Sequence, residues 1–149
     1  LTSYGRKGKP PRLFHASSSE IFGAASEQPQ NENSPLNPVT PYGLDKTEAH
    51  MHILKATTAG EIDAVCGVLY NHESHLRPES FISRKMSVGA ARIRLGLQSV
   101  IEVGSLSQKR DWGFAGDHVE AILTATLYGK STHYVVGTGK LLSPTVTGD

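Results

Sequence analysis

The stretch "DAVCGVLYN", Asp63–Asn71, is nearly continuously apolar and carries β-branched side chains. A half-exposed strand alternates apolar and polar residues, whereas a strand buried on both faces of a parallel sheet does not. This stretch therefore predicts a central strand of a parallel sheet.

Strands and helices are predicted to alternate on both sides of this strand. In chain order we expect a strand over 12–18, a long loop over 22–41, a helix over 42–60 closed by Gly60, the central strand, a polar loop over 71–80, a helix over 81–99, a short strand over 100–104, a loop over 109–116, a helix over 117–130 capped by Asp117, and a strand over 133–139. Such alternation indicates an α/β, Rossmann-like fold with a parallel sheet, as one unit over 1–149.

Composition excludes several classes of protein. The net charge is +1 with no long run of one sign, so we expect neither a nucleic-acid partner nor a membrane surface. No apolar stretch is long enough to span a bilayer, and the N-terminus has no signal-peptide pattern. The single cysteine, Cys66, excludes a disulfide framework and is expected to be an inert core thiol. These features predict a soluble, cytoplasmic protein.

Tyr42 and Lys46 lie four residues apart at the start of the predicted helix, so their side chains share one face. A cation beside a phenol favours the phenolate and suits the tyrosine to acid–base chemistry. Taken alone, this pair also fits a packed tyrosine beside a solvated lysine.

Polar side chains follow two predicted strands at their carboxyl ends. Ser18 and Glu20 come after the first strand, and Asn71 begins the loop after the central one. Sites in parallel sheets lie beyond these ends, so we expect the two clusters to face one crevice. Glu20 could instead cap the turn after its strand.

The histidines of "HESH" and "HMH" could in principle ligate zinc. Their spacings match no common site, however, and His50 and His52 would face different sides of a helix. We therefore predict no metal.

Several motifs together resemble the active-site stretch of the extended short-chain dehydrogenase/reductases, and most closely the GDP-mannose 4,6-dehydratase family. These motifs, in order from about Arg12 to Gly139, are "HASSSEIFG", "NPVTPYGLDK", "LYNHES", "RPESFISRKM", "QKRDWGFAGDHVEAI" and "YVVGTG". The resemblance implies an NADP-dependent lyase that oxidises GDP-mannose at carbon 4, removes water across carbons 5 and 6, and returns the hydride at carbon 6. The product is GDP-4-dehydro-6-deoxy-mannose.

The resemblance also implies roles for individual residues. The catalytic positions are Ser18, Glu20, Tyr42 and Lys46. Tyr42 and Lys46 also contact the cofactor, together with His72 and Arg77. Substrate contacts fall at Asn71, Lys85 and Arg110.

Other readings remain open. The chain could belong to another nucleotide-sugar dehydratase, epimerase or reductase, although Glu20 argues against the last two because they need no acid–base group at carbon 5. It could also be an inactive nucleotide-sugar-binding fragment.

The Gly-rich cofactor loop of the superfamily is absent from the sequence. We therefore expect an incomplete fold, namely the C-terminal part of an NADP-binding Rossmann domain with part of the nucleotide-sugar-binding region. The residues that choose NADP over NAD are missing with it. The resemblance also implies a dimer or tetramer at full length.

Overall fold

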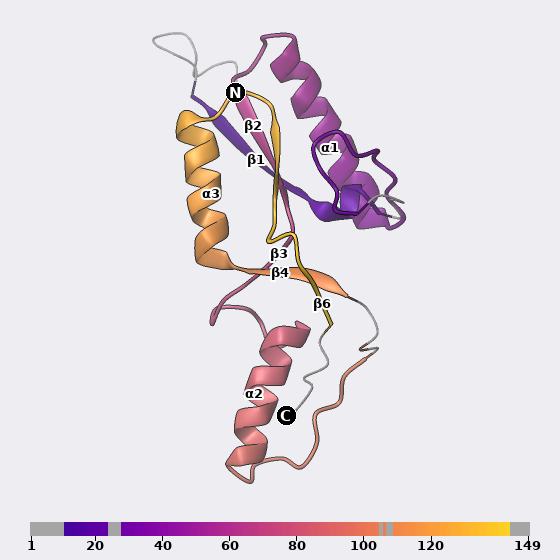
Figure 1. Ribbon diagram of the computed structural model, residues 1–149, viewed down its shortest axis with the longest axis vertical. Helices are drawn as coiled ribbons and strands as arrows, with labels where there is room; N and C mark the ends of the chain where they lie inside the picture. The colour runs from indigo at the N-terminus through magenta and orange to yellow at the C-terminus, as the bar shows by residue number, and fades with distance from the viewer. Residues whose placement is uncertain (1–10, 24–27, 105, 107–108, 144–149) are drawn as a thin grey trace.

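The computed structural model describes residues 11–23, 28–104, 106 and 109–143. Its elements, in chain order, are β1 (Leu13–Ser18), the 3₁₀ turn η2 (Ser19–Ile21), α1 (Pro41–Thr58), β2 (Ala64–Leu69), β3 (Asn71–Glu73), α2 (Ile82–Arg94), β4 (Arg110–Phe114), α3 (Ala115–Tyr128), β5 (His133–Val136) and β6 (Leu141–Leu142). Helices α1 and α3 flank the strands, and α2 lies at the far end beyond β4 (Figure 1).

The main sheet is parallel and has the order β1-β2-β5, with β2 in the centre. Five of the six β2 residues are buried, in agreement with the apolar pattern from which this strand was predicted. The predicted strands over 12–18 and 133–139 are also confirmed, as β1 and β5. The parallel, Rossmann-like architecture is therefore confirmed for this sheet.

Helix α1 begins with strong local signals. The Thr40 hydroxyl accepts a hydrogen bond from the Gly43 amide (2.9 Å), and Pro41 occupies the first turn. Beyond the last turn Gly60 has φ +72°, a left-handed conformation that glycine adopts easily after a helix. The predicted span of the helix is thus confirmed to within two residues.

The core nearest the site lies under the 3₁₀ turn that follows β1. Ile21, Phe22 and Val68 are buried together, with Tyr70 and Val135 packed against them. This cluster anchors the end of β1, and with it Ser18 and Glu20, to β2 and β5.

A second sheet has the order β3-β4-β6, with β3 parallel and β6 antiparallel to β4. The predictions of a loop over 71–80 and of another over 109–116 were wrong where β3 and β4 form. The sequences of β3 and β4 are polar and lack the apolar pattern of a strand. They form strands because they pair with each other, and β4 also pairs with β6. Tertiary contacts override such local preferences.

Two further predictions were wrong. No strand forms over 100–104, where instead the Ile101 side chain packs on Gly89 of α2. Asp117 does not cap α3, because this helix starts earlier, at Ala115, with Phe114 in the N-cap position. Asp117 lies in the first turn, where its negative charge interacts favourably with the helix dipole and so stabilises the helix.

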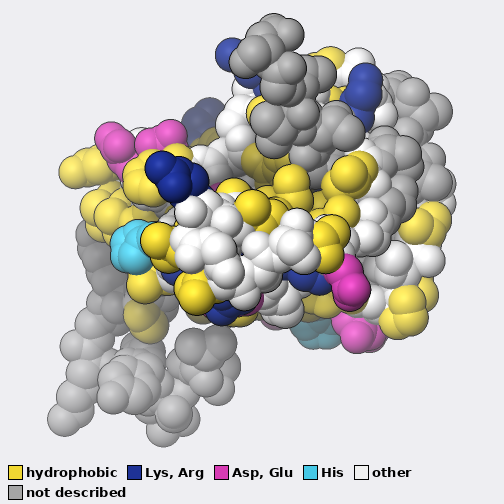
Figure 2. Space-filling view, turned by 90° about the horizontal axis from the view of Figure 1, so that it is seen from below, with side chains coloured by type: hydrophobic (Ala, Val, Ile, Leu, Met, Phe, Trp, Pro, Cys, Tyr) yellow, Lys and Arg dark blue, Asp and Glu magenta, His cyan; other side chains and the backbone are white. Residues whose placement is uncertain are grey.

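Hydrophobic side chains remain exposed at the α2 end of the molecule, where Figure 2 shows them among charged ones. Phe81, Ile93, Leu95 and Leu97 contribute to this exposed apolar surface. Among the described helices, none is both long enough and apolar enough to cross a bilayer.

Candidate active site

The first turns of α1 carry Tyr42 and Lys46. The Lys46 Nζ lies 5.7 Å from the centroid of the Tyr42 ring and donates a hydrogen bond to the Ala16 carbonyl of β1 (2.9 Å). The Tyr42 side chain is about half exposed, at 54%. The ammonium is therefore held between the strand and the phenol, and the phenol remains accessible to a ligand.

Ser18 and Glu20 lie at the carboxyl end of β1 and in the 3₁₀ turn that follows it. The Ser18 hydroxyl accepts a hydrogen bond from the Glu20 amide (3.3 Å) and so caps the 3₁₀ turn. The Glu20 carboxylate receives the Thr40 hydroxyl (3.5 Å) on one oxygen and Arg110 Nη1 (3.4 Å) on the other. Its side chain is thereby oriented from the N-cap of α1 and from β4.

Gly43 allows α1 to approach this turn closely. A Cβ at residue 43 would lie 2.8 Å from the carbonyl oxygen of Glu20, closer than van der Waals contact permits. The absence of a side chain at this buried position thus sets the separation between the turn bearing Glu20 and the helix bearing Tyr42.

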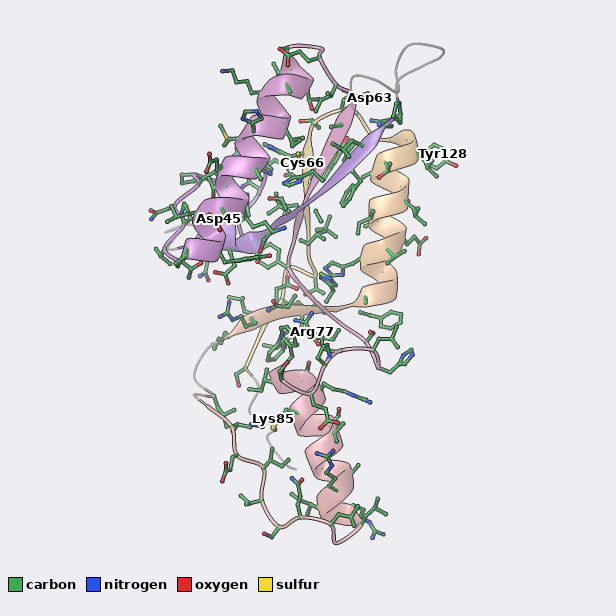
Figure 3. The ribbon with its side chains drawn as sticks, turned by 180° about the vertical axis from the view of Figure 1, so that it is seen from behind. Asp45, Asp63, Cys66, Arg77, Lys85 and Tyr128 are labelled. Carbon is green, nitrogen blue, oxygen red and sulfur yellow. The ribbon has the colours of Figure 1, made fainter. Side chains whose placement is uncertain are left out.

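A further wall of the site is formed by β3 and the loop after it. His72 Nδ1 donates to the Tyr70 carbonyl (2.9 Å), which fixes the orientation of the ring. Arg77 forms an ion pair with Glu73 (3.3 Å), and its guanidinium carbon lies 3.7 Å from the centroid of the Phe81 ring. Figure 3 shows Arg77 just beyond β4, between the sheet and α2.

These walls enclose a pocket of about 700 Å³. Its polar lining includes most of the site residues predicted from the sequence: Ser18, Glu20, Tyr42, Lys46, Asn71, His72 and Arg77. Glu20 and Tyr42 therefore face the same cavity, as the sequence pattern requires. The volume falls within the range that is usual for small-molecule and cofactor sites.

The remaining two predicted site residues lie elsewhere. Arg110 lines an adjoining pocket of about 370 Å³, which also includes Glu20 and Asn71. Lys85 is exposed on α2 and is not among the residues that line either pocket. In Figure 3 Lys85 lies on α2, farther from the main sheet than Arg77.

The sequence of the chain matches a known family over almost its whole length. The profile of the family described as GDP-mannose 4,6 dehydratase matches residues 2–145. The chain belongs to this family.

Curated relatives support the same assignment. GDP-mannose 4,6 dehydratase 2 of Arabidopsis thaliana is 40% identical over 131 residues, which are 88% of this chain and 35% of the relative. The Homo sapiens GDP-mannose 4,6 dehydratase is 38% identical over 132 residues, 89% of this chain and 36% of the relative. The chain thus spans about a third of the length of these relatives.

Solved structures agree with the fold. RMD from Pseudomonas aeruginosa, complexed with NADPH, has a TM-score of 0.84 at 24% identity, over 91% of this chain and 48% of that one. A dTDP-glucose 4,6-dehydratase from Bacillus anthracis, in complex with NAD, has a TM-score of 0.79 at 21% identity, over 89% and 42%. At these identities the likeness concerns the fold alone.

Cys66 and the absence of a metal site were two other expectations for this member of the GDP-mannose 4,6-dehydratase family. Cys66 is buried in β2, and burial raises the pKa of its thiol to about 11, so the expectation of an inert core thiol agrees with the structure. Across the part of the chain that the structure describes, no three His, Cys, Asp or Glu side chains are arranged to hold a metal ion.

Sequence reasoning missed two contacts of the site. One is the ion pair between Glu20 and Arg110, which are ninety positions apart in the chain and so leave no local signal. The other is a buried hydrogen bond between Ser17 and His50 behind the pocket (3.1 Å). Its signal was the continuation of the Tyr42–Lys46 spacing by a further four residues to His50.

Proposed function

We propose that this chain carries the catalytic centre of GDP-mannose 4,6-dehydration, with GDP-mannose as substrate and GDP-4-dehydro-6-deoxy-mannose as product. The observation that carries the proposal is the shared pocket of Glu20 and Tyr42. A phenol and a carboxylate in one cavity provide two separate acid–base groups, as oxidation at carbon 4 and elimination across carbons 5 and 6 require.

Tyr42 accepts the proton of the 4-hydroxyl group in the first step. The Lys46 ammonium, 5.7 Å from the ring centroid, stabilises the negative charge on the phenol oxygen. Ser18, at the end of β1, holds the 4-oxygen of the sugar by a hydrogen bond. The 4-keto group that results acidifies the hydrogen on carbon 5.

Glu20 then removes the proton from carbon 5, and as the protonated acid delivers it to the departing 6-hydroxyl. Its carboxylate is held by Thr40 and Arg110, so it is oriented before the substrate arrives. A carboxylate at this place distinguishes the reaction from a simple epimerisation or ketoreduction at carbon 4.

The pocket fits a nicotinamide cofactor. Part of its wall is apolar and is formed by Ala16, Leu69 and Phe81. Lys46 and Arg77 supply cations for ribose and phosphate oxygens. His72 completes the proposed set of cofactor contacts. A nicotinamide bound here would accept the hydride from carbon 4 and return it to carbon 6, while carbon 5 would regain a proton from solvent through Glu20.

We assign NADP rather than NAD as this cofactor. The family resemblance and the NADPH complex of the similar Pseudomonas structure support the assignment.

The nucleotide diphosphate is assigned to the neighbouring pocket. Arg110 presents a guanidinium there, which suits a diphosphate because it donates several hydrogen bonds in a fixed plane. Asn71 lines both pockets and is assigned to the sugar. Lys85 is also assigned to the diphosphate, on the resemblance alone.

The dimer or tetramer expected at full length stays a prediction. Leu44 and Met51 of α1 are exposed, which suits pairing through this helix. Sedimentation equilibrium tests this expectation.

The test of function is incubation of the protein with GDP-mannose and NADP, followed by NMR detection of the 4-keto-6-deoxy sugar. UDP-glucose and dTDP-glucose serve as substrate controls. We expect product from GDP-mannose only. The protein used must first be shown to carry cofactor. If such protein forms no product and calorimetry shows no binding of GDP-mannose, the proposal is contradicted.

Two variants separate the proposed steps. Tyr42→Phe removes the base for carbon 4 and should stop the reaction before any reduced nicotinamide accumulates. Glu20→Gln leaves that step intact and should accumulate reduced nicotinamide without loss of water. Wild-type rates in both variants would refute the assigned roles.

A further inference from the structure

One stripe of α1 carries a third polar residue beyond the proposed catalytic pair. Tyr42, Lys46 and His50 follow one another at intervals of four residues, so they lie along the same face of the helix. The exposure of this stripe decreases along the helix. Tyr42 is 54% exposed, whereas His50 is 2% exposed and faces the sheet.

Two successive turns of this stripe are bound to two successive residues of β1. Lys46 Nζ donates to the Ala16 carbonyl at 2.9 Å, and His50 Nδ1 lies 3.1 Å from the hydroxyl of Ser17, which is itself 4% exposed. The next residue of β1 is Ser18. The contacts therefore fix both the height and the rotation of α1 relative to the strand that presents Ser18.

His50 belongs to a cluster of imidazoles between α1 and the sheet. His15 of β1 and His133 of β5 pair with Cys66 of β2 in one row across the sheet, so these side chains point to the same face. The His50 ring is stacked on His133 at 5.4 Å and lies 6.5 Å from His15, centroid to centroid. Figure 3 shows Cys66 on the strand that faces α1.

The cluster accommodates neutral rings. Burial, followed by the charges of His133 and His15, lowers the pKa of His50 to about 4. Burial and the charge of Lys46 also lower the pKa of His15. The Cys66 thiol, with a pKa of about 11, offers no anion at neutral pH.

Among the residues that the structure describes, the acidic residue Glu32 contacts the cluster. Glu32 accepts a hydrogen bond from His133 through its backbone carbonyl (3.0 Å), while its carboxylate accepts the Val135 amide (2.8 Å). A proton on His50 would place a buried cation beside two imidazoles and on the same face of α1 as the Lys46 ammonium. Such a charge would destabilise the packing of α1 against β1.

We propose that neutral His50 is a positioning residue, which holds Tyr42 and Lys46 in place against Ser18 through its hydrogen bond to Ser17, and that protonation of His50 loosens this arrangement. The inference rests on the proposed function for its effect on catalysis. Its effect on the geometry of α1 is independent of that function.

The test compares three substitutions with a matched control. His50→Leu and Ser17→Ala each delete the hydrogen bond. His50→Asn keeps a polar nitrogen near the position of Nδ1 but cannot be protonated. His52→Gln alters the exposed histidine two residues along α1 and serves as the control.

The first readout is kinetic. We expect His50→Leu and Ser17→Ala to lower kcat by about 10- to 100-fold with little change in KM, since small displacements of catalytic groups have effects of this size. We expect kcat of the wild-type protein to decline on acidification. His50→Asn should recover most of the kcat lost in His50→Leu and should not show this decline. His52→Gln should behave as wild type.

The second readout needs no turnover. The NMR signals of the Tyr42 ring, assigned with Tyr42→Phe, should shift on acidification in the wild-type protein and in His52→Gln, but not in His50→Asn. Ser17→Ala should shift them at neutral pH. If Ser17→Ala leaves these signals and kcat unchanged, the inference is wrong, even where His50→Leu fails to fold. If Tyr42 signals respond as expected but no variant turns over GDP-mannose, the positioning role stands and the proposed function fails.

Discussion

Arg110 Nη1 lies 3.4 Å from Glu20 Oε1, so the cation assigned to the diphosphate contacts the carboxylate assigned to carbon 5. Both side chains are partly exposed, at 46% and 33%, and an ion pair of this kind contributes little to stability. We expect the loss of Arg110 to change the affinity for the ligand rather than the stability of the fold.

Arg110→Met should weaken the binding of GDP-mannose while leaving the thermal unfolding midpoint nearly unchanged. Loss of one charge-assisted contact to a phosphate is expected to raise Kd by about tenfold or more. Isothermal titration calorimetry measures Kd. Arg110→Lys should be intermediate, and Lys130→Met, at an exposed position after α3, should bind as wild type. A variant that loses stability but binds normally would contradict the assignment.

Gly43→Ala should impair the site through the backbone. The added Cβ would meet the Glu20 carbonyl at 2.8 Å, and this oxygen cannot rotate away as a flexible side chain can. We expect a loss of about 1–3 kcal/mol in the free energy of unfolding and a lower kcat. Urea denaturation and the product assay measure these quantities. In the control, Gly89→Ala, the Cβ meets only the Ile101 side chain, so a milder effect is expected.

Asp111→Asn should loosen the loop between β5 and β6. The buried Asp111 carboxylate accepts hydrogen bonds from the Thr138 amide and hydroxyl and from the Gly139 amide. Replacing one acceptor oxygen by a donor nitrogen should cost about 2 kcal/mol in the free energy of unfolding. Unchanged stability would show that these bonds contribute little.

The same substitution should be visible in the titration of Tyr70. Burial and then the charge of Asp111 raise the pKa of the Tyr70 phenol. Asp111→Asn removes the second cause, so this pKa should fall toward its ordinary value. Spectrophotometric titration, with Tyr70→Phe to identify the signal, measures the change. A pKa that does not move would mean that burial acts alone.

Stability should decline in acid because of His50. Its pKa is about 4 in the folded chain against 6.5 ordinarily, so between these values the unfolded chain binds a proton that the folded chain does not. The contribution is complete above pH 6.5 and is lost as the pH falls toward 4, by up to about 3 kcal/mol. The lowered pKa of His15 acts in the same direction.

Urea denaturation across this pH range measures the effect. His50→Asn should flatten the dependence, and His52→Gln should preserve it. An equally steep decline in His50→Asn would assign the acid sensitivity to other groups.

Cys66 should resist thiol reagents in the folded chain. Its side chain is 1% exposed and its thiol pKa is about 11, so little thiolate is present at neutral pH. Mass spectrometry after treatment with iodoacetamide should show modification only once urea is added. Rapid modification of the native chain would indicate that α1 opens readily from the sheet.

The main sheet was predictable because its strands carry their own signals. The apolar run of β2 reports burial on both faces, and Gly60 reports the end of α1. These features act over a few residues, so the amino-acid order alone specifies them. The four-residue spacing of Tyr42 and Lys46 is equally local.

β4 could not be found in this way. Arg110–Phe114 contains charged residues and a glycine, which is typical of a loop, and it becomes a strand because β3 and β6 lie on its two sides. The opposite error occurred over 100–104, which forms no strand although it is apolar, and whose Ile101 side chain packs on Gly89 of α2.

The sequence by itself determined the family, the parallel α/β architecture of the main sheet, and the chemical groups of the candidate site, since each is encoded in short-range order. Only the tertiary structure decided that Arg110 contacts Glu20, that His50 meets Ser17, and that Gly43 lies against the Glu20 carbonyl. These contacts join residues far apart in the chain, and they exist because α1 and β4 pack on the end of β1. Folding, rather than residue type, therefore sets the distances on which the proposed chemistry depends.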